Sequence, residues 1–401
     1  MISRTANRMV SNSFSSLEYE YCEINWDDFV TTEIGIYIHV PFCPRLCTFC
    51  PFHRVLYNRE LKDRYVKALI REIELRELQG EVEWVYIGGG TPNLLEAEEI
   101  GAILDKLREY VRIEDIAIEG KPRYFTREYL EVLNRYDVSK LSMGVESLKE
   151  ESLDSVERDE TGISLIEQIV NDAHNHDMVV NADLMVGLPM QYSGDVISDV
   201  TTLSEVGLDQ ISTYPFTKAP GAKHRRRTTS KHIFEMIEKA ADTIEEAGYV
   251  RENIWVFSKP SLAKKSLTED PIEYIGYGPS AFSVAGNLQV VNPHIENYLD
   301  SISHEKTMGF KITFDEGFNA WRKFAHRLYD LRVSEDFLST MPRNIRWVLK
   351  LLRLMGYIKG DKVTRKGRYF IHDLTTTVIE KLPFPLGNPV SRGVACMNIF
   401  F

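Results

Sequence analysis

Short apolar runs alternate with longer, charged segments along residues 35–248. Each run is rich in β-branched and aromatic residues, and each following segment carries apolar residues at helical spacing. The six pairs are 35–40 with 59–78, 83–89 with 96–110, 115–120 with 126–136, 140–145 with 149–158, 178–188 with 194–207, and 210–216 with 231–248. Such repetition predicts a parallel α/β sheet with helices outside, curled by right-handed crossovers into a partial or full barrel.

Unusual motifs follow the predicted strands. A cysteine-rich loop follows the first strand and GGGTP follows the second, while GVES, GLP and YPFTKAP follow the fourth, fifth and sixth. Barrel enzymes place their chemistry at the C-terminal ends of the strands. We therefore expect these motifs to meet on one face of the barrel.

The pattern changes after about residue 300. Residues 318–331 and 341–359 predict helices, and residues 360–374 predict a turn, a short strand and a further helix. This succession has the form of a small winged-helix-like α+β module that packs against the barrel. The predicted organisation is a lid segment at residues 1–34, a barrel with its extension at 35–300, and a helical and winged module at 301–401.

Composition excludes some classes of partner. The net charge is −11, whereas proteins that track phosphates usually present a basic face, so nucleic acid is not expected. The one basic run, residues 223–231, predicts either a solvated loop or a contact to an anionic substrate. No apolar run is long enough to span a bilayer, and the N-terminus lacks the apolar core of a secretory signal. A cytoplasmic protein is expected.

Three of the five cysteines lie in one short loop. Cys43, Cys47 and Cys50 have the spacing C-x3-C-x2-C, and such clustering argues against a disulfide framework. Thiolates bind soft metal centres. A structural zinc site needs four protein ligands, which His39 and His53 could complete. A [4Fe–4S] cluster on three thiolates instead has one iron open to a further ligand.

The same spacing is the signature of radical S-adenosylmethionine (SAM) enzymes. In addition, IYIHVPFCPRLCTFC, VYIGGGTP, LSMGVES, NADLMVGLP and IGYGPSAFS, in that order, resemble the oxygen-independent coproporphyrinogen III oxidase family. The resemblance covers residues 35–300 and implies a partial (β/α)6 radical SAM barrel. It also implies a [4Fe–4S] cluster held by Cys43, Cys47 and Cys50. The open iron would bind SAM, which is cleaved to methionine and a 5′-deoxyadenosyl radical.

The resemblance further implies contacts to two SAM molecules. The implied cofactor-binding residues, most of which follow successive strands, are Tyr37, Phe49, Gly88, Gly89, Gly90, Thr91, Glu119, Glu146, Arg158, Asp183, Thr217 and Phe282. Among them Glu146, Arg158 and Asp183 are the implied catalytic set. Asp183 stands inside an apolar strand, where an unpaired carboxylate destabilises the fold, and this favours a functional role.

Two positions depart from the family pattern. Glu146 stands where the family usually has glutamine, and Phe52 stands where porphyrinogen oxidases carry a fourth cysteine. Phe52 therefore argues against oxidative decarboxylation of propionates. Glu146 and the long segment before the barrel argue against a haem chaperone.

The sequence thus predicts a third branch of the family, the two-SAM methyltransferases and cyclopropanases. Such an enzyme transfers a methyl or methylene carbon to an sp2 carbon of an unsaturated or aromatic substrate. A coproporphyrinogen-type decarboxylase and a haem-binding chaperone without radical catalysis are the alternatives. The implied protein partner is an electron donor such as flavodoxin or ferredoxin.

Overall fold

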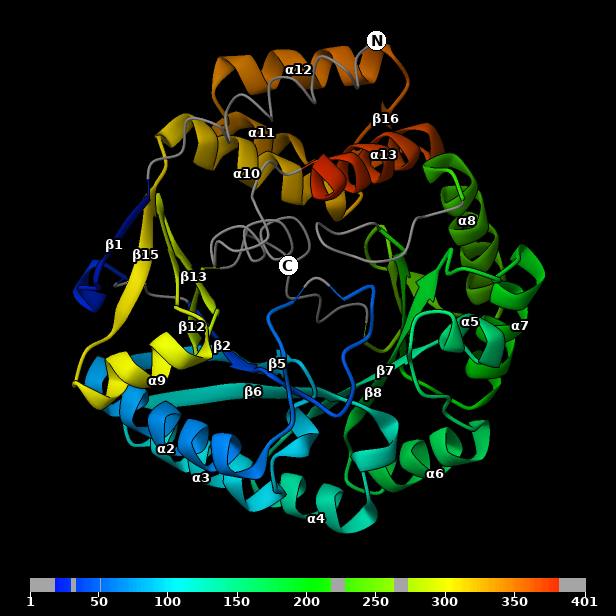
Figure 1. Ribbon diagram of the computed structural model, residues 1–401. Coiled ribbons are helices and arrows are strands. Elements are labelled where there is room, and N and C mark those ends of the chain that lie inside the picture. Colours follow the sequence, from blue (N-terminus) through cyan, green and yellow to red (C-terminus); the bar gives the residue numbers. More distant parts are fainter. Residues whose placement is uncertain (1–18, 30–33, 51, 218–227, 263–272, 382–401) are drawn as a thin grey trace.

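A curved sheet forms the centre of the molecule (Figure 1). The computed structural model describes residues 19–29, 34–50, 52–217, 228–262 and 273–381. The sheet has 13 strands in the order β1-β15-β14-β13-β12-β2-β5-β6-β7-β8-β9-β11-β10. Six of them pair in parallel as predicted: β2 (Ile34–Val40), β5 (Gly80–Gly89), β6 (Val111–Gly120), β7 (Lys140–Glu146), β8 (Val179–Val186) and β9 (Gln210–Pro215). The partial (β/α)6 barrel is confirmed.

Helices surround this curved sheet on its outer side (Figure 1). They are α2 (Arg59–Arg76), α3 (Ala97–Arg108), α4 (Arg127–Arg135), α5 (Glu150–Asp154), α6 (Ile163–His174), α7 (Ser193–Glu205) and α8 (Ser230–Glu246). The predicted crossover helix at 149–158 is wrong in extent, because α5 is only five residues long. The longer helix α6 packs on the sheet instead, through Ile166, Ile169, Val170 and Ala173.

The two faces of the barrel strands have different surroundings. On β2, Ile36, Ile38 and Val40 pack in the main core with the helices, whereas Tyr37 belongs to a separate cluster on the inner wall. Successive side chains of a strand point to opposite faces. The odd-numbered residues of β2 therefore face the barrel interior.

Further strands extend both edges of the sheet, one of them in parallel with β2 and the others antiparallel. Beside β2 lie β12 (Tyr274–Tyr277), β13 (Phe282–Ala285), β14 (Leu288–Val291), β15 (Met308–Thr313) and β1 (Tyr19–Glu23), and beside β9 lie β11 (Val256–Ser258) and β10 (Val250–Arg251). The helix α9 (Ile295–Ser303) connects β14 to β15. Because residues 19–23 form an edge strand, the expected lid stays a prediction for residues 1–18, outside the described residues.

The C-terminal module has the predicted winged-helix-like order. It contains α10 (Glu316–Tyr329), α11 (Glu335–Thr340), α12 (Arg343–Leu354), a hairpin of β16 (Ile358–Lys359) and β17 (Lys362–Val363), and α13 (Arg365–Lys381). At one end of α10, Tyr329 packs on Trp255 with ring centroids 5.1 Å apart, and the other end lines a pocket with β13 and β14. Helix α10 therefore reaches from the β13–β14 hairpin to the segment between β10 and β11.

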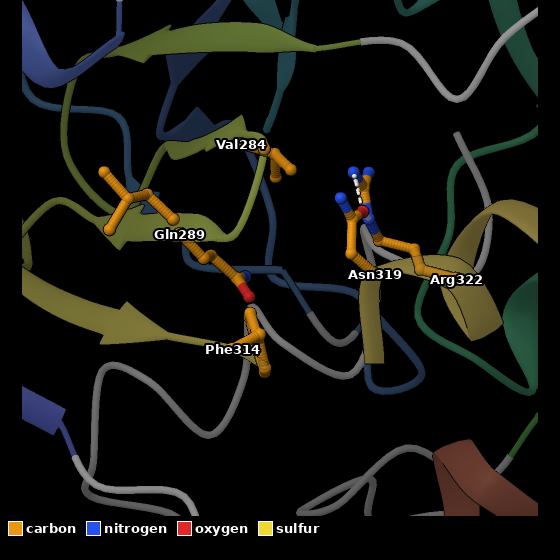
Figure 2. A pocket seen from close by; sticks show the side chains of 7 residues that line it. Val284, Gln289, Phe314, Asn319 and Arg322 are labelled. Atoms are coloured by element: carbon orange, nitrogen blue, oxygen red, sulfur yellow. Dashed lines mark hydrogen bonds between the residues drawn. The ribbon is translucent and has the colours of Figure 1, made fainter. Parts of the chain in front are cut away.

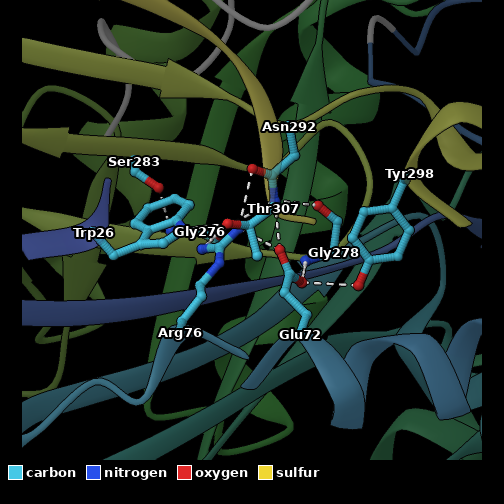
Figure 3. A network of polar contacts seen from close by, with 9 residues as sticks. All are labelled: Trp26, Glu72, Arg76, Gly276, Gly278, Ser283, Asn292, Tyr298 and Thr307. Atoms are coloured by element: carbon cyan, nitrogen blue, oxygen red, sulfur yellow. Dashed lines mark hydrogen bonds and ion pairs between the residues drawn. The ribbon is translucent and has the colours of Figure 1, made fainter. Parts of the chain in front are cut away.

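A buried carboxylate joins α2 to the extension of the sheet (Figure 3). Glu72 accepts hydrogen bonds from the Gly278 amide and the Tyr298 hydroxyl at 2.8 Å, and from Asn292 Nδ2 at 3.1 Å. Burial raises the pKa of Glu72. The donors offset the loss of hydration of this carboxylate, so the contacts stabilise the fold only as a complete set.

Arg76, one helical turn further along α2, completes this network. Its guanidinium donates to Glu72, to the Gly276 carbonyl oxygen at 2.8 Å and to Asn292 Oδ1 at 3.2 Å. Its charged carbon lies 3.5 Å from the ring centroid of Trp26. The network thereby holds the N-terminal segment and the loop after β12 on one helix.

No helix in the described part of the chain has the length and apolar character to cross a membrane.

Candidate functional site

The cysteine loop begins where β2 ends. Cys43 and Cys47 are buried and Cys50 is half-buried, and the Cys50 amide donates to the Cys47 carbonyl oxygen at 3.4 Å. Burial raises the pKa of the Cys43 thiol and raises that of Cys50 to about 12. Metal binding therefore has to displace these protons, since the thiolate is the ligand.

Arg54 holds the loop in shape. Its guanidinium donates to three backbone carbonyl oxygens, those of Cys47 at 2.5 Å, Cys50 at 2.7 Å and Phe52 at 3.0 Å. We did not single out this residue in the sequence. Only its position four residues after the last cysteine could have indicated a role, and a lone arginine in a loop is not a specific motif.

Phe49 packs the cysteine loop against the residues that follow β8 and β9. The Phe49 ring packs in a small cluster with Cys47, Leu188 and Phe216, and its centroid lies 6.5 Å from that of Phe216. Thr217, the next residue, is half-buried at this edge. Two of the predicted cofactor contacts, Phe49 and Thr217, thus lie close to the cysteine loop.

The glycines after β5 allow a close approach of the backbone to the loop. A Cβ atom on Gly90 would lie 2.6 Å from the carbonyl oxygen of Phe42, which is closer than real side chains come. The next residue, Thr91, is buried, and its hydroxyl lies 3.7 Å from Cys43 Sγ. Any side chain at Gly90 would push β5 away from the cysteines.

Gly88 leaves room for two predicted site residues. A Cβ atom there would lie 3.1 Å from both the Tyr37 ring and the carboxyl carbon of Glu119. Glu119 ends β6 and accepts hydrogen bonds from the Gly89 amide at 2.5 Å and from the Tyr86 hydroxyl at 3.0 Å. The pKa of Glu119 is raised to about 7, mainly by burial and also by the nearby acidic side chains, while the two donors oppose this rise.

Glu146 lies at a backbone irregularity. The pairing of β7 with β8 shifts between Gly144 and Glu146, and Glu146 has a φ of 69°, which is rare for a residue other than glycine. Its Oε1 lies 3.5 Å from Nη2 of Arg158, which also donates to the Gly144 carbonyl oxygen and contacts the Cys47 side chain. Burial raises the pKa of Glu146, and Arg158 opposes this effect. Such strained positions cluster at functional sites.

Asp183 completes a group of three carboxylates inside the barrel. It accepts hydrogen bonds from Ser142 Oγ at 2.7 Å and Asn181 Nδ2 at 2.9 Å, and burial raises its pKa. The charges of Asp183 and Glu146 also raise the pKa of Glu119. Grouped carboxylates in a partly dry space favour a cation among them.

His39 is engaged on both ring nitrogens. Nδ1 lies 2.9 Å from the Tyr37 hydroxyl, and Nε2 lies 2.9 Å from the His53 carbonyl oxygen. Burial lowers the pKa of His39 to about 4, so the ring is neutral, with Nε2 donating and Nδ1 accepting. Neither ring nitrogen of His39 is available for zinc, so His39 does not complete a zinc site with the three cysteines.

The loop fits an iron–sulfur cluster better than a single ion. Among the described residues, no group of three or more His, Cys, Asp or Glu side chains could hold one metal ion. In a cubic cluster, each thiolate binds a different iron, so the three sulfurs need not converge on one point. Cys47 lies close enough to raise the pKa of both Cys43 and Cys50, and Arg54 lies beside them. This donor set suits a cluster with three protein ligands.

The structure brings the predicted site residues to one end of the barrel. Phe282 lies fully buried on β13 in the inner-wall cluster that contains Tyr37. The other members are linked to the loop or to Glu119 by the contacts above. Their roles toward SAM stay predictions. Most of the basic run, up to residue 227, lies outside the described residues.

Comparison with known proteins agrees with this site. Residues 37–203 match the model of the Radical SAM superfamily. The chain carries a radical SAM domain. It is 25% identical over 373 residues to the haem chaperone HemW of Buchnera aphidicola, covering 85% of this chain and 97% of that protein. It is 25% identical over 394 residues to the oxygen-independent coproporphyrinogen III oxidase of Salmonella typhimurium, covering 85% and 84%.

A solved structure has the same fold. The coproporphyrinogen III oxidase HemN of Escherichia coli superposes with a TM-score of 0.73 at 21% identity, covering 87% of this chain and 90% of that one. This likeness confirms the radical SAM fold.

The predicted C-methylation or cyclopropanation is wrong. The relatives named above are a haem chaperone and coproporphyrinogen oxidases, and none of them is a methyltransferase or cyclopropanase. The prediction depended on single-residue departures at Glu146 and Phe52 and on the long segment before the barrel. In the structure, Glu146 lies beside Arg158, so its charge already has a partner and indicates no changed reaction.

Proposed function

We propose that this chain is a radical SAM protein that acts on a tetrapyrrole. The observation that carries the proposal is the meeting of the cysteine loop with Glu119, Glu146 and Asp183 at one end of a radical SAM barrel. When bound, a [4Fe–4S] cluster supplies the electron for reductive cleavage of SAM. Haem and coproporphyrinogen, which occur in the names of the relatives, are both tetrapyrroles, and this supports the class of substrate.

The residues of this chain have separable roles in the proposal. Cys43, Cys47 and Cys50 hold the cluster, and Arg54 keeps their loop in shape. The half-buried carboxylates Glu119 and Asp183 attract the positive charge of SAM, whose sulfonium gains more beside an ionised acid in a partly dry site than in water.

A second SAM molecule is part of the proposal. We assign its contacts to Glu146, Asp183, Arg158 and Phe49: Arg158, beside Glu146, can donate to a SAM carboxylate, while the two acids attract its cationic groups. The proposed stoichiometry is therefore two SAM molecules per chain, which equilibrium dialysis of the reconstituted protein measures.

A haem chaperone is the second candidate. Phe52 favours it, since an apolar ring occupies the position of the fourth cysteine of porphyrinogen oxidases. In addition, this chain matches the haem chaperone HemW of Buchnera aphidicola over 97% of that protein's length. In this candidate the chain binds haem without converting it.

Anaerobic reconstitution tests both candidates. The protein should bind about four iron and four sulfide, as a cubic cluster requires. With SAM, a reductant and either haem or coproporphyrinogen III, mass spectrometry should detect 5′-deoxyadenosine together with a changed tetrapyrrole. Cys47→Ala should abolish cleavage, whereas the control Cys22→Ala should not. Haem binding with no cleavage above the Cys47→Ala level would establish the chaperone instead. Binding of neither tetrapyrrole would contradict both.

A further inference from the structure

A separate pocket lies between the inner wall of the sheet extension and α10 (Figure 2). It is lined by Val284, Gly286, Leu288, Gln289, Phe314, Asn319 and Arg322, and its empty volume is about 220 Å³, including open space at its mouth. This volume includes space open to solvent, and the enclosed part has room for about one water molecule. The pocket therefore admits at most one small polar group of a larger ligand.

The side-chain amide of Gln289 has no partner in the described part of the chain. Gln289 is 1% exposed, and neither Oε1 nor Nε2 makes a hydrogen bond there. Buried polar atoms are almost always hydrogen-bonded, because an unsatisfied one destabilises the fold. The amide lines the pocket opposite Asn319 and Arg322 (Figure 2). A group that enters the pocket can supply the missing contacts.

Arg322 adds a positive charge that lacks an ion-pair partner within the described ranges. Its Nε and Nη2 donate to Asn319 Oδ1 at 3.3 and 2.9 Å, which occupies only part of the guanidinium. Burial lowers the pKa of Arg322, although Glu273 and Tyr274 lie near enough to oppose this effect. The Glu273 carboxylate is engaged with the Gly286 amide at 2.7 Å. The free N–H groups of Arg322 thus suit an external anion.

His326, one turn further along α10, is a further titratable group near Arg322. Burial and the charge of Arg322 lower the pKa of His326 to about 4, so this side chain is neutral near pH 7 and leaves the positive charge on the arginine.

Tyr274 connects this pocket to the cysteine site. Its buried hydroxyl has no hydrogen-bond partner among the residues that the structure describes. Tyr274 packs in the inner-wall cluster with Tyr37, Phe282 and Val284, and Val284 lines the pocket. The pocket and the predicted SAM contact Tyr37 therefore share one continuous wall of the barrel.

We propose that this pocket binds a carboxylate substituent of the ligand held in the barrel. Arg322 neutralises the carboxylate and donates to it together with Gln289 Nε2 and the Tyr274 hydroxyl. Leu288 and Phe314 contact the methylene groups that precede it. The inference depends on the proposed function and deepens it, since haem and coproporphyrinogen carry propionate side chains of this kind.

Absorbance titration of the reconstituted full chain tests the pocket with haem and haem dimethyl ester. The two ligands share the ring and the iron, but the ester lacks both carboxylate charges. Wild-type protein should bind haem at least about tenfold more tightly than the ester, as expected of hydrogen bonds to a charged group. Arg322→Met should remove this preference, and Gln289→Met should reduce it at least about threefold. The control Arg112→Met changes an exposed arginine paired with Glu81 and should preserve the preference.

Each outcome bears on a different claim. Equal binding of haem and its ester to wild-type protein contradicts the carboxylate pocket and leaves the tetrapyrrole proposal standing. A preference for haem that persists in Gln289→Met and in Arg322→Met also contradicts the pocket, because the carboxylates then bind elsewhere. Binding of neither ligand contradicts the proposed function, and the pocket assignment fails with it. If Arg322→Met does not fold, the Gln289→Met measurement decides alone.

Discussion

Gln289 and Asn292 are two side-chain amides three residues apart, and each is about 1% exposed. Asn292 uses its whole amide. Its Nδ2 donates to Glu72 at 3.1 Å and to the Gly278 carbonyl oxygen at 2.8 Å, and its Oδ1 accepts from Arg76 at 3.2 Å. Gln289 makes no such bond in the described part of the chain. Two equally buried amides therefore differ completely in their hydrogen bonding.

The two faces of the sheet extension explain the contrast. Val290 packs in the main core with the helices, whereas Val291 packs on the inner wall with Tyr37. Alternation along the strand places Asn292 toward α2 and Gln289 toward the barrel interior. On the outer face, the Asn292 amide finds all of its partners within the protein. On the inner face, polar groups without partners indicate a ligand, and this difference separates structural from functional burial.

Removing a charge from the outer network should have the largest effect. Arg76→Met leaves Glu72 buried without its cation, and breaking a buried pair in this way costs about 3–5 kcal/mol. Chemical denaturation should show this loss in the free energy of unfolding. The surface control Arg112→Met should change that free energy by less than about 0.5 kcal/mol.

The double variant Glu72→Met with Arg76→Met sharpens this result. Residues in one network are coupled, so the double variant should lose less stability than the sum of the two single variants. If the losses of unfolding free energy in the two single variants add up to that of the double variant, Glu72 and Arg76 are not coupled. The contrast between this network and Gln289 would then have no basis.

Inside the barrel, the stability of the SAM-free protein should depend on pH through Glu119. Its pKa is about 7 in the folded state against 4.5 ordinarily, so the folded state binds more protons between these values. Stability therefore falls as pH rises from about 4.5 to 7 and stays lower above, by on the order of 3 kcal/mol. Denaturation of wild type and Glu119→Gln at pH 5 and pH 8 measures this. Equal pH slopes in the two proteins would show that the barrel interior does not penalise this charge.

The fold behind this contrast was predictable from the sequence, whereas the contacts of individual polar side chains were not. The six strand–helix units and the cysteine loop follow from local periodicity and spacing, which one chain segment determines by itself. The pocket could not be predicted, because Gln289 and Arg322 come together only when α10 reaches the β13–β14 hairpin. Arg54 was missed for the same reason, since its role depends on the folded path of the loop.

The reaction could not be predicted from the chemistry of single residues in the sequence. Glu146 and Phe52 were given too much weight as departures from a family pattern. The effect of a single charge depends on its neighbour, and only the fold shows that Glu146 lies beside Arg158. The missed helix α6 is different, because Ile166, Ile169, Val170 and Ala173 have helical spacing that was readable in the sequence.

Asp183→Asn should separate binding from folding on the inner face. The amide keeps the shape of the carboxylate and loses the charge that attracts SAM. We expect the affinity for SAM to fall about tenfold, as for one charged contact, while the free energy of unfolding changes by less than about 1 kcal/mol. Isothermal titration and denaturation measure the two quantities.

Asp199→Asn is the matched control for Asp183→Asn. Asp199 is also buried and accepts from a serine, Ser147, at 2.7 Å, but it lies on α7 outside the barrel. The affinity for SAM should be unchanged in this variant. A similar loss of affinity in both variants would mean that the position of the charge inside the barrel does not matter.

The smallest effect on stability should come from Gln289→Met, the inner counterpart of Asn292. Methionine has nearly the same length, and replacing an unsatisfied buried amide by an apolar group is close to neutral or stabilising. We expect the free energy of unfolding of the ligand-free protein to stay within about 1 kcal/mol of wild type or to rise. Asn292→Leu, which deprives Glu72 and Arg76 of a partner, should instead lose about 2–3 kcal/mol, because several buried groups then lack bonds. Denaturation of the two variants side by side measures the contrast directly. If Gln289→Met loses as much stability as Asn292→Leu, the Gln289 amide has structural partners in solution, and its burial no longer indicates a ligand.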